Sequence, residues 1–267
     1  TDSVPRRARE TEKAPRSADK PMPASLRPVS GSEGEYARRW SFADLFVAAG
    51  IALSAAFLFL PALSHSRFAA QRNYCQENLR QIGVALAQYS EVFASVFPSI
   101  PDKGNRAFAG VYLPTLRDNQ FLADSQSARC PSSSFIGGTP EQMPTLREID
   151  SAPQPLLAKV RSRANGGYGY NVGYLHGSGK YMGPRNLRRA AVGLVADTPS
   201  VGTIKNRTDN HGGKGQNCLF EDGHIAFIPG CIGEDCPDAI YLNRDGRVAP
   251  GKDENDTVIV HAETLIE

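Results

Sequence analysis

The chain has 267 residues, 40% of them hydrophobic, and a net charge of +2. Nine Lys and Arg against six Asp and Glu give residues 1–40 a charge of +3, so the remainder is close to −1. Because a nucleic-acid-binding face needs clustered basic side chains, this balance argues against a nucleic-acid partner. Residues 1–40 are rich in Pro, Ala, Ser and Arg, and we expect them to form a disordered cytoplasmic tail.

Residues 42–64 are predicted to form a transmembrane helix. Within them, LFVAAGIALSAAFLFLPAL (residues 45–63) has nineteen residues and no charge, about the length that crosses roughly 30 Å of hydrocarbon. Arg38 and Arg39 precede this run, with more Arg and Lys upstream, and only two arginines follow it closely. This excess favours a cytoplasmic N-terminus and a periplasmic or extracellular C-terminal domain. A cleavable signal peptide is disfavoured because the run begins more than forty residues into the sequence.

Residues 65–97 are predicted to continue this helix outside the membrane. Apolar residues recur there at spacings of three and four, as on one face of a helix. These residues are Cys75, Leu79, Ile82, Leu86, Tyr89 and Phe93. We expect this seam to pack on a globular domain, with Pro98 and Pro101 ending the helix.

Residues 98–267 are predicted to form an exported antiparallel β-sheet domain. Strand-like segments lie at 168–175, 190–197, 216–228, 239–249 and 256–263. Two of them contain Asp-Gly between apolar runs, a strong local signal for a tight hairpin. The predicted fold class is therefore α+β, with one long N-terminal helix packed on an antiparallel sheet with long loops.

The five cysteines limit which metal and redox motifs the chain can carry. No Cys-x-x-Cys pair occurs, which argues against a zinc ribbon or a thioredoxin-like motif. In CIGEDC, Cys231 and Cys236 fit a local disulfide if this part of the chain is exported. Cys218 lies between apolar residues and is our candidate for a buried free cysteine, whereas the pairing of Cys75 and Cys130 stays open.

Four stretches of the chain carry a resemblance to a known family. FADLFVAAGIALSAAFLFLPALSHSRFAAQRNYCQENLRQIGVALAQYS runs from an apolar helix through Leu-Pro-Ala-Leu to Asn-Leu-x-Gln-Ile-Gly, and RCPSS supplies a Cys-Pro. DNHGGKGQNCLFEDGHIAFI joins a histidine to Asp-Gly, and NRDGRVAPGKDENDTVIV follows. Over roughly residues 42–260, the chain resembles the type IV pilin and type II secretion pseudopilin superfamily. More narrowly, it resembles the prepilin-like family named for a histidine, nine residues and Asp-Gly, otherwise of unknown function.

The chain departs from that family pattern at three points. Ten residues separate His211 from Asp222. The resemblance implies a peptidase site with Gly before a mature Phe and Glu at the fifth mature position. Here Ser41 precedes Phe42, and Phe46 stands at the fifth position. A subunit cleaved before Phe42 and an uncleaved single-span protein that keeps its tail both remain compatible with the sequence.

The signature residues His211, Asp222 and Gly223 are expected to be structural. If a hairpin turns at Asp222-Gly223, His211 lies before the outgoing strand and is too far from Asp222 to share one zinc ion easily. We expect Asp222 to cap its turn through an Asx-type bond and His211 to bond loop backbone. The alternative is a metal or catalytic site with Asp197 and Asp209 as further ligands.

Calcium is the one cofactor that the sequence suggests. KDENDT contains Asp253, Asn255 and Asp256, and hard cations prefer such carboxylate and amide oxygens. Several pseudopilins bind calcium in a C-terminal loop, so the resemblance also implies this site. The spacing is not that of an EF-hand, and a solvated acidic loop is the alternative interpretation.

The sequence predicts a non-enzymatic, single-span membrane protein that acts in envelope assembly or interaction. It contains no Gly-x-Ser-x-Gly, no His-Glu-x-x-His and no phosphate-binding loop. Expected partners are the membrane and either pilus-like or secretion-machinery proteins or further copies of the chain. The first alternative is a cleaved pseudopilin subunit of a type II secretion or type IV pilus-like filament. The second is a metal-dependent envelope hydrolase.

Overall fold

The computed structural model describes residues 41–123, 128–133, 142–200, 208–230 and 240–265. The predicted tail and the predicted Cys231–Cys236 disulfide lie outside these ranges. The chain divides into two compact units, Thr1–Leu53 and Ser54–Glu267.

Helix α1 (Phe42–Val92, 51 residues) begins at a reciprocal cap. The backbone N–H of Ala43 donates to Ser41 Oγ (3.3 Å), and the backbone N–H of Ser41 donates to Asp44 Oδ2 (3.1 Å). Two backbone donors at the helix start are thereby satisfied, as in a capping box. The local sequence around Ser41 therefore explains why the helix starts at Phe42.

The first part of α1 is apolar on all sides and exposed. Its most apolar 18-residue window has a mean hydropathy of 2.2, and none of that window is buried. The helix continues through Pro61. By length and composition, this helix suggests a single membrane span.

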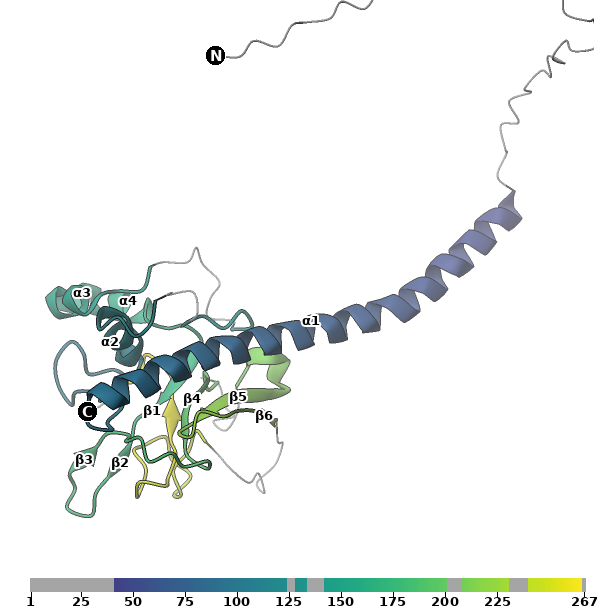
Figure 1. Cartoon of the computed structure of the whole chain (residues 1–267). Coiled ribbons are helices and arrows are strands. Elements are labelled where there is room, and N and C mark those ends of the chain that lie inside the picture. The colour runs from purple at the N-terminus through teal and green to yellow at the C-terminus, as the bar shows by residue number, and fades with distance from the viewer. Residues whose placement is uncertain (1–40, 124–127, 134–141, 201–207, 231–239, 266–267) are drawn as a thin grey trace, which may run out of the picture. The chain divides into compact units, whose positions relative to one another are not determined.

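The second part of α1 buries one face, as the apolar seam predicts. Cys75, Leu79, Ile82 and Leu86 are at most 1% exposed, and this stretch lies beside the sheet (Figure 1). A Cβ added at Gly83 would come within 3.0 Å of a methyl group of Leu219. Glycine at this position therefore permits a close approach between helix and sheet.

α1 ends at Val92, before residue 97 where we predicted its end. Ala94 and Ser95 adopt φ values of 50° and 60°, and the Ser95 backbone N–H donates to Ser90 O (2.8 Å). The chain therefore leaves the helix through left-handed residues, upstream of Pro98. Phe93 consequently lies outside the helix and is 41% exposed.

A five-stranded antiparallel sheet forms the centre of the domain and confirms the predicted α+β class. Its order is β6-β5-β4-β1-β7, and β2 and β3 form a separate pair. The strands are β1 (Tyr168–Asn171), β2 (Tyr174–Leu175), β3 (Tyr181–Met182), β4 (Gly193–Asp197), β5 (Gly215–Phe220), β6 (Ile225–Pro229) and β7 (Ile259–Val260). The hairpin predicted at Asp222-Gly223 is the β5–β6 hairpin, with Leu219 opposite Ile225 next to the turn.

Short helices complete the domain. They are η2 (Ala109–Val111), α2 (Tyr112–Asp118), α3 (Leu146–Ser151), α4 (Gln154–Ser162) and η5 (Asn210–Gly213). Tyr112 of α2 stacks on Tyr170 of β1 with ring centroids 4.2 Å apart. Both rings are buried with the seam of α1 in one hydrophobic core.

The predicted strands at 239–249 are wrong for the residues described there. Residues 240–249 form turns, in which the Asn243 backbone N–H donates to Arg247 O (2.9 Å). Asn243 Oδ1 also accepts from the backbone N–H groups of Asp245 and Arg247. The asparagine side chain thus satisfies the backbone donors that a strand partner would otherwise take.

Candidate functional site

The turn of the β5–β6 hairpin holds Asp222 and Gly223, as predicted. Asp222 Oδ1 accepts from the backbone N–H of His224 (3.1 Å), which is the expected Asx-type cap. Gly223 has φ +90°, in the left-handed region that glycine adopts without a Cβ penalty. The Asp222 carboxylate also pairs with His224 Nδ1 at 2.5 Å, and both side chains are partly exposed.

His211 lies before the opposite end of β5, in the turn η5. Its own φ is 54°, and Gly212 follows with φ +65°. Asn210 anchors this turn, because its side-chain amide donates to Gly167 O (3.1 Å). His211 is 2% exposed. The structure therefore separates His211 from Asp222, in agreement with the hairpin argument.

His211 contacts side chains, whereas we predicted loop backbone. Its Nε2 lies 3.2 Å from Asp197 Oδ2 and 3.0 Å from Asn217 Nδ2. The ring also meets Phe68 of α1 and Phe227 of β6 edge to face, with centroid distances of 6.3 and 6.4 Å. His211 therefore lies in the buried layer between the helix and the sheet.

Asp197, the last residue of β4, is a fully buried carboxylate. Its Oδ2 accepts from the backbone N–H (2.7 Å) and side-chain amide (3.1 Å) of Asn217. Its Oδ1 lies 3.4 Å from the side-chain amide of Asn210. Together with His211, these donors compensate the loss of water around the carboxylate. Asp197 was named as a possible ligand beside His211, and the structure brings the two residues together.

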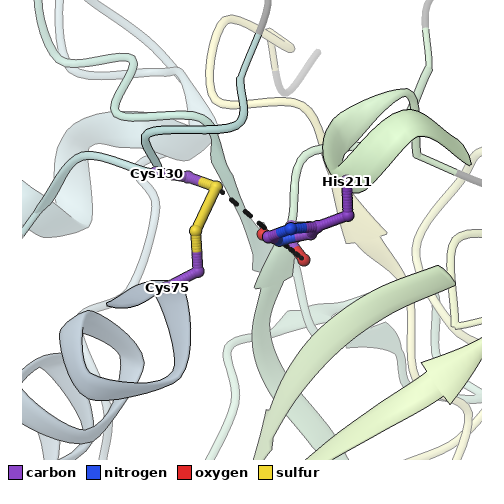
Figure 2. Close-up of side chains that lie close together, drawn as sticks. Cys75, Cys130 and His211 are labelled. Carbon is purple, nitrogen blue, oxygen red and sulfur yellow. Dashed lines mark hydrogen bonds and ion pairs between the residues drawn. A yellow bond between two sulfur atoms is a disulfide. The ribbon is translucent and has the colours of Figure 1, made fainter. Parts of the chain in front are cut away.

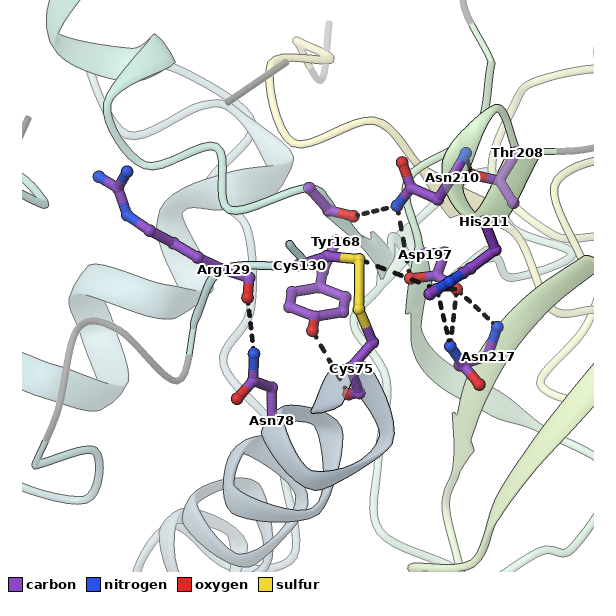
Figure 3. Close-up of a disulfide and its surroundings, with 11 residues drawn as sticks. Cys75, Asn78, Arg129, Cys130, Tyr168, Asp197, Thr208, Asn210, His211 and Asn217 are labelled. Atoms are coloured by element: carbon purple, nitrogen blue, oxygen red, sulfur yellow. Dashed lines mark hydrogen bonds and ion pairs between the residues drawn. A yellow bond between two sulfur atoms is a disulfide. The ribbon is translucent and has the colours of Figure 1, made fainter. Parts of the chain in front are cut away.

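A disulfide joins Cys75 of α1 to Cys130, with Cα atoms 5.3 Å apart (Figure 3). Hydrogen bonds that do not involve sulfur also hold the backbone around the disulfide. Asn78 Nδ2 donates to Arg129 O (2.6 Å). In addition, Tyr168 Oη donates to Cys75 O (3.3 Å). The disulfide therefore links two segments that hydrogen bonds already hold together.

Sequence reasoning left the pairing of Cys75 and Cys130 open. One signal was present, since the position of Cys75 on the apolar seam directs its sulfur toward the domain core. Its partner could not be found without the fold, because the approach of the Cys130 loop depends on Gly166. A Cβ at Gly166 would lie 1.5 Å from Ala128 O.

Four potential ligand atoms converge at the disulfide. Sulfurs of Cys75 and Cys130, an oxygen of Asp197 and a nitrogen of His211 all lie within 4.8 Å of one another, and all four residues are buried. Figure 2 shows the imidazole of His211 directed at the Cys130 sulfur, 3.9 Å away. While the sulfurs are bonded to each other, they are not thiolates, and the group acts as a covalent and polar link between helix and sheet.

Cys218 is free and buried, as expected. Burial, and to a lesser degree the negative charge of Asp197, raises the pKa of its thiol far above the ordinary value. A thiol that stays protonated is a poor nucleophile and a poor metal ligand. Cys218 therefore serves as a core residue on β5.

The predicted calcium ligands already accept hydrogen bonds from protein groups. Asp253 pairs with the guanidinium of Arg244, which lowers the pKa of that carboxyl below its usual value. Asn255 Oδ1 accepts from Arg189 (3.0 Å), and Asp256 Oδ2 accepts from the backbone N–H of Lys252 (2.8 Å). Calcium binding by these three residues stays a prediction.

Comparison of the chain with protein-family models finds no matching family, and comparison with curated proteins and with solved structures finds no match. The long apolar helix packed on an antiparallel sheet is consistent with a pilin-like architecture.

Proposed function

We propose that the chain is a non-enzymatic, single-span membrane protein that displays a pilin-like domain outside the cytoplasm, for assembly or interaction at the cell envelope. The observation that carries this proposal is the exposed, apolar run near the start of α1, in which residues 45–63 carry no charge. In water, such a surface would be an unusually large apolar patch. In a bilayer it is the expected surface of a span.

The arginine excess before the span and the disulfide support the orientation. Disulfides persist in oxidising compartments and are rare in the cytosol. A buried Cys75–Cys130 bond therefore favours an exported domain. The tail would then remain in the cytoplasm, in line with the positive-inside rule.

The burial of the His211–Asp197 pair supports a non-enzymatic role. Both side chains have no exposed surface, whereas a catalytic pair has to reach a substrate within hydrogen-bond distance. Partners would instead meet the surface of the domain. We propose pilus-like or secretion-machinery proteins, or further copies of the chain, as those partners.

Protease treatment of intact spheroplasts tests the proposed topology. Digestion of the C-terminal domain with protection of the N-terminal tail is the expected result. Digestion of the tail with protection of the domain would reverse the topology and remove the proposal. Detergent-lysed spheroplasts, in which both parts are accessible, provide the control.

A cleaved filament subunit is the second candidate, and one observation favours it. α1 begins at Phe42, the position at which processing would leave the mature chain. However, Asp44 is engaged in the cap of Ser41, and cleavage after Ser41 would break that cap. N-terminal sequencing of the protein from cells separates the candidates, because only the filament subunit begins at Phe42.

A further inference from the structure

The disulfide site brings together four buried side chains of the kinds that bind zinc, two of them joined in a disulfide. We propose that, when the Cys75–Cys130 bond is reduced, Cys75, Cys130, Asp197 and His211 bind one Zn²⁺ ion. The chain would thus close the same junction between helix and sheet in two ways, covalently when oxidised and through a metal when reduced. This inference does not depend on the proposed membrane topology.

The ligand set fits zinc by type and number. Structural zinc sites use four protein ligands in a tetrahedron, with thiolates and imidazoles as the commonest groups and carboxylates as a third kind. Four such groups converge here within 4.8 Å and are fully enclosed. A tetrahedron with Zn–S bonds of about 2.3 Å places two sulfurs roughly 3.8 Å apart. The two sulfurs therefore need only separate from bonded to non-bonded contact.

The surroundings keep the ligands in place after reduction. Asn78, through Arg129 O, holds the backbone next to Cys130, and Tyr168 holds the carbonyl of Cys75. The Cys130 backbone N–H also donates to Gly166 O (2.8 Å). None of these bonds involves sulfur, so reduction leaves both cysteines near Asp197 and His211.

The orientation of the other two ligands is also set by the protein. Asn217 donates to Asp197 Oδ2 through both its backbone N–H and its side-chain amide. Such hydrogen bonds fix the direction of a metal-binding carboxylate. His211 presents Nε2 to Asp197 and Cys130, whereas its buried Nδ1 has no hydrogen-bond partner among the described residues. Nε2 is therefore the nitrogen that would take the metal.

The reaction balances with a dithiol reductant. A dithiol gives two electrons and two protons to the Cys75–Cys130 bond, which yields two protein thiols and one oxidised dithiol. Zn²⁺ then replaces the two thiol protons, and the proton of the His211 ring moves from Nε2 to Nδ1, so two protons leave as two Zn–S bonds form. Because four protein groups complete the tetrahedron, no position remains for water, and the centre would be structural.

Cobalt titration of the full-length chain in detergent tests the proposal. The chain carries Cys231→Ser and Cys236→Ser, which remove two rival thiols outside the described residues. After reduction by a phosphine, Co²⁺ should give the visible bands of a tetrahedral thiolate site, and one equivalent of Zn²⁺ should abolish them. The oxidised chain should give no such bands. An octahedral Co²⁺ spectrum for the reduced chain would overturn the proposal.

Matched variants identify the ligands. His211→Ala and Asp197→Ala should each weaken Zn²⁺ binding by more than the roughly 10–100-fold that loss of an outer hydrogen bond costs. His224→Ala removes the histidine of the exposed His–Asp pair and should leave the affinity unchanged. Equal affinity in all three variants would show that the metal binds elsewhere and would overturn the assignment. The spectrum of the unsubstituted site decides the geometry even if a buried variant fails to fold.

Discussion

Two stretches of α1 have similar apolar side chains but opposite surroundings. Leu53 in the first stretch is 71% exposed, whereas Leu79 in the second is fully buried. The first stretch, residues 45–63, has no charged residue, but Gln, Asn, Arg and Glu surround the apolar seam of the second. A helix between sheet and water needs such a polar face, and a helix surrounded by lipid does not. The presence or absence of polar residues therefore distinguishes the two environments.

Charges in the first stretch should have the largest effect, which is loss of the chain from the membrane. Leu53→Lys combined with Phe57→Lys places two ammonium groups near the middle of the proposed span. Each costs about 2.5–3.5 kcal/mol for insertion at a helix centre. We expect the chain to leave the carbonate-washed membrane fraction. Retention there would show that this stretch is not the anchor, and Leu53→Ala is the control that should stay membrane-bound.

Loss of the disulfide should affect only the second stretch and its domain. Cys75→Ser with Cys130→Ser opens a loop with a sequence separation of 55 residues. In the chain-entropy model this lowers the free energy of unfolding by about 4 kcal/mol. Denaturant unfolding with and without reductant measures the effect. In the double variant, reductant should act only through the predicted Cys231–Cys236 bond, so the difference that it makes should shrink. An undiminished difference would place the relevant disulfide elsewhere.

The same Leu→Ala change should have different results in the two stretches. Leu79→Ala leaves a cavity in the core and should lower the free energy of unfolding of the domain by about 3 kcal/mol. Leu53→Ala changes an exposed side chain and should leave the domain unaffected. Denaturation of both variants in the same detergent measures the contrast. Equal destabilisation would contradict the assignment of lipid and core surroundings.

The two histidine–aspartate pairs of the sheet differ in the same way, because His211–Asp197 is buried and His224–Asp222 is partly exposed. His211→Ala removes a buried ring and one partner of Asp197, so we expect a loss of about 2 kcal/mol. His224→Ala removes one member of a partly exposed pair and should cost less than about 1 kcal/mol. Thermal unfolding of the two variants ranks them. A larger effect for His224 would mean that the hairpin turn stabilises the domain more than the buried contacts of His211 do.

The smallest expected effect is a weak dependence of the domain's stability on pH, caused by the Asp222–His224 pair. Burial is the largest single effect on the pKa of Asp222 and raises it, but the hydrogen bonds from the side chain and backbone of His224 together lower it by more. The net pKa is therefore below the ordinary value of 3.8. The stabilisation is present above that value and is lost as the pH falls through the lower pKa of the folded state. The stability difference between the native chain and Asp222→Asn should shrink over this interval, and a growing difference would contradict the sign.

Local sequence patterns predicted the helix seam, the hairpin turn and the buried Cys218. Each depends on residues that lie near one another in sequence: the spacing of Leu79 and Ile82, the Asp-Gly pair, or the apolar neighbours of Cys218. The end of α1 was less predictable, because left-handed Ala94 and Ser95 end it before the prolines. Neither residue type signals that conformation in the sequence.

The site at the disulfide was only partly predictable, because its four residues come from four separate segments of the chain. Asp197 was named beside His211 on residue type alone. The pairing of Cys75 with Cys130 needs the close approach at Gly166, which tertiary packing decides. The failure at residues 240–249 has a similar cause, since Asn243 bonds the local backbone and keeps it in turns.

Labelling with a membrane-impermeant thiol reagent determines whether one span separates the tail from the domain. One variant carries Ser32→Cys in the tail, and another carries Ser178→Cys at an exposed position of the domain. The unsubstituted chain gives the background. In intact spheroplasts, we predict labelling of the Ser178→Cys variant alone, with the Ser32→Cys variant labelled only after lysis. Labelling of both variants, or of the Ser32→Cys variant alone, before lysis would contradict the account.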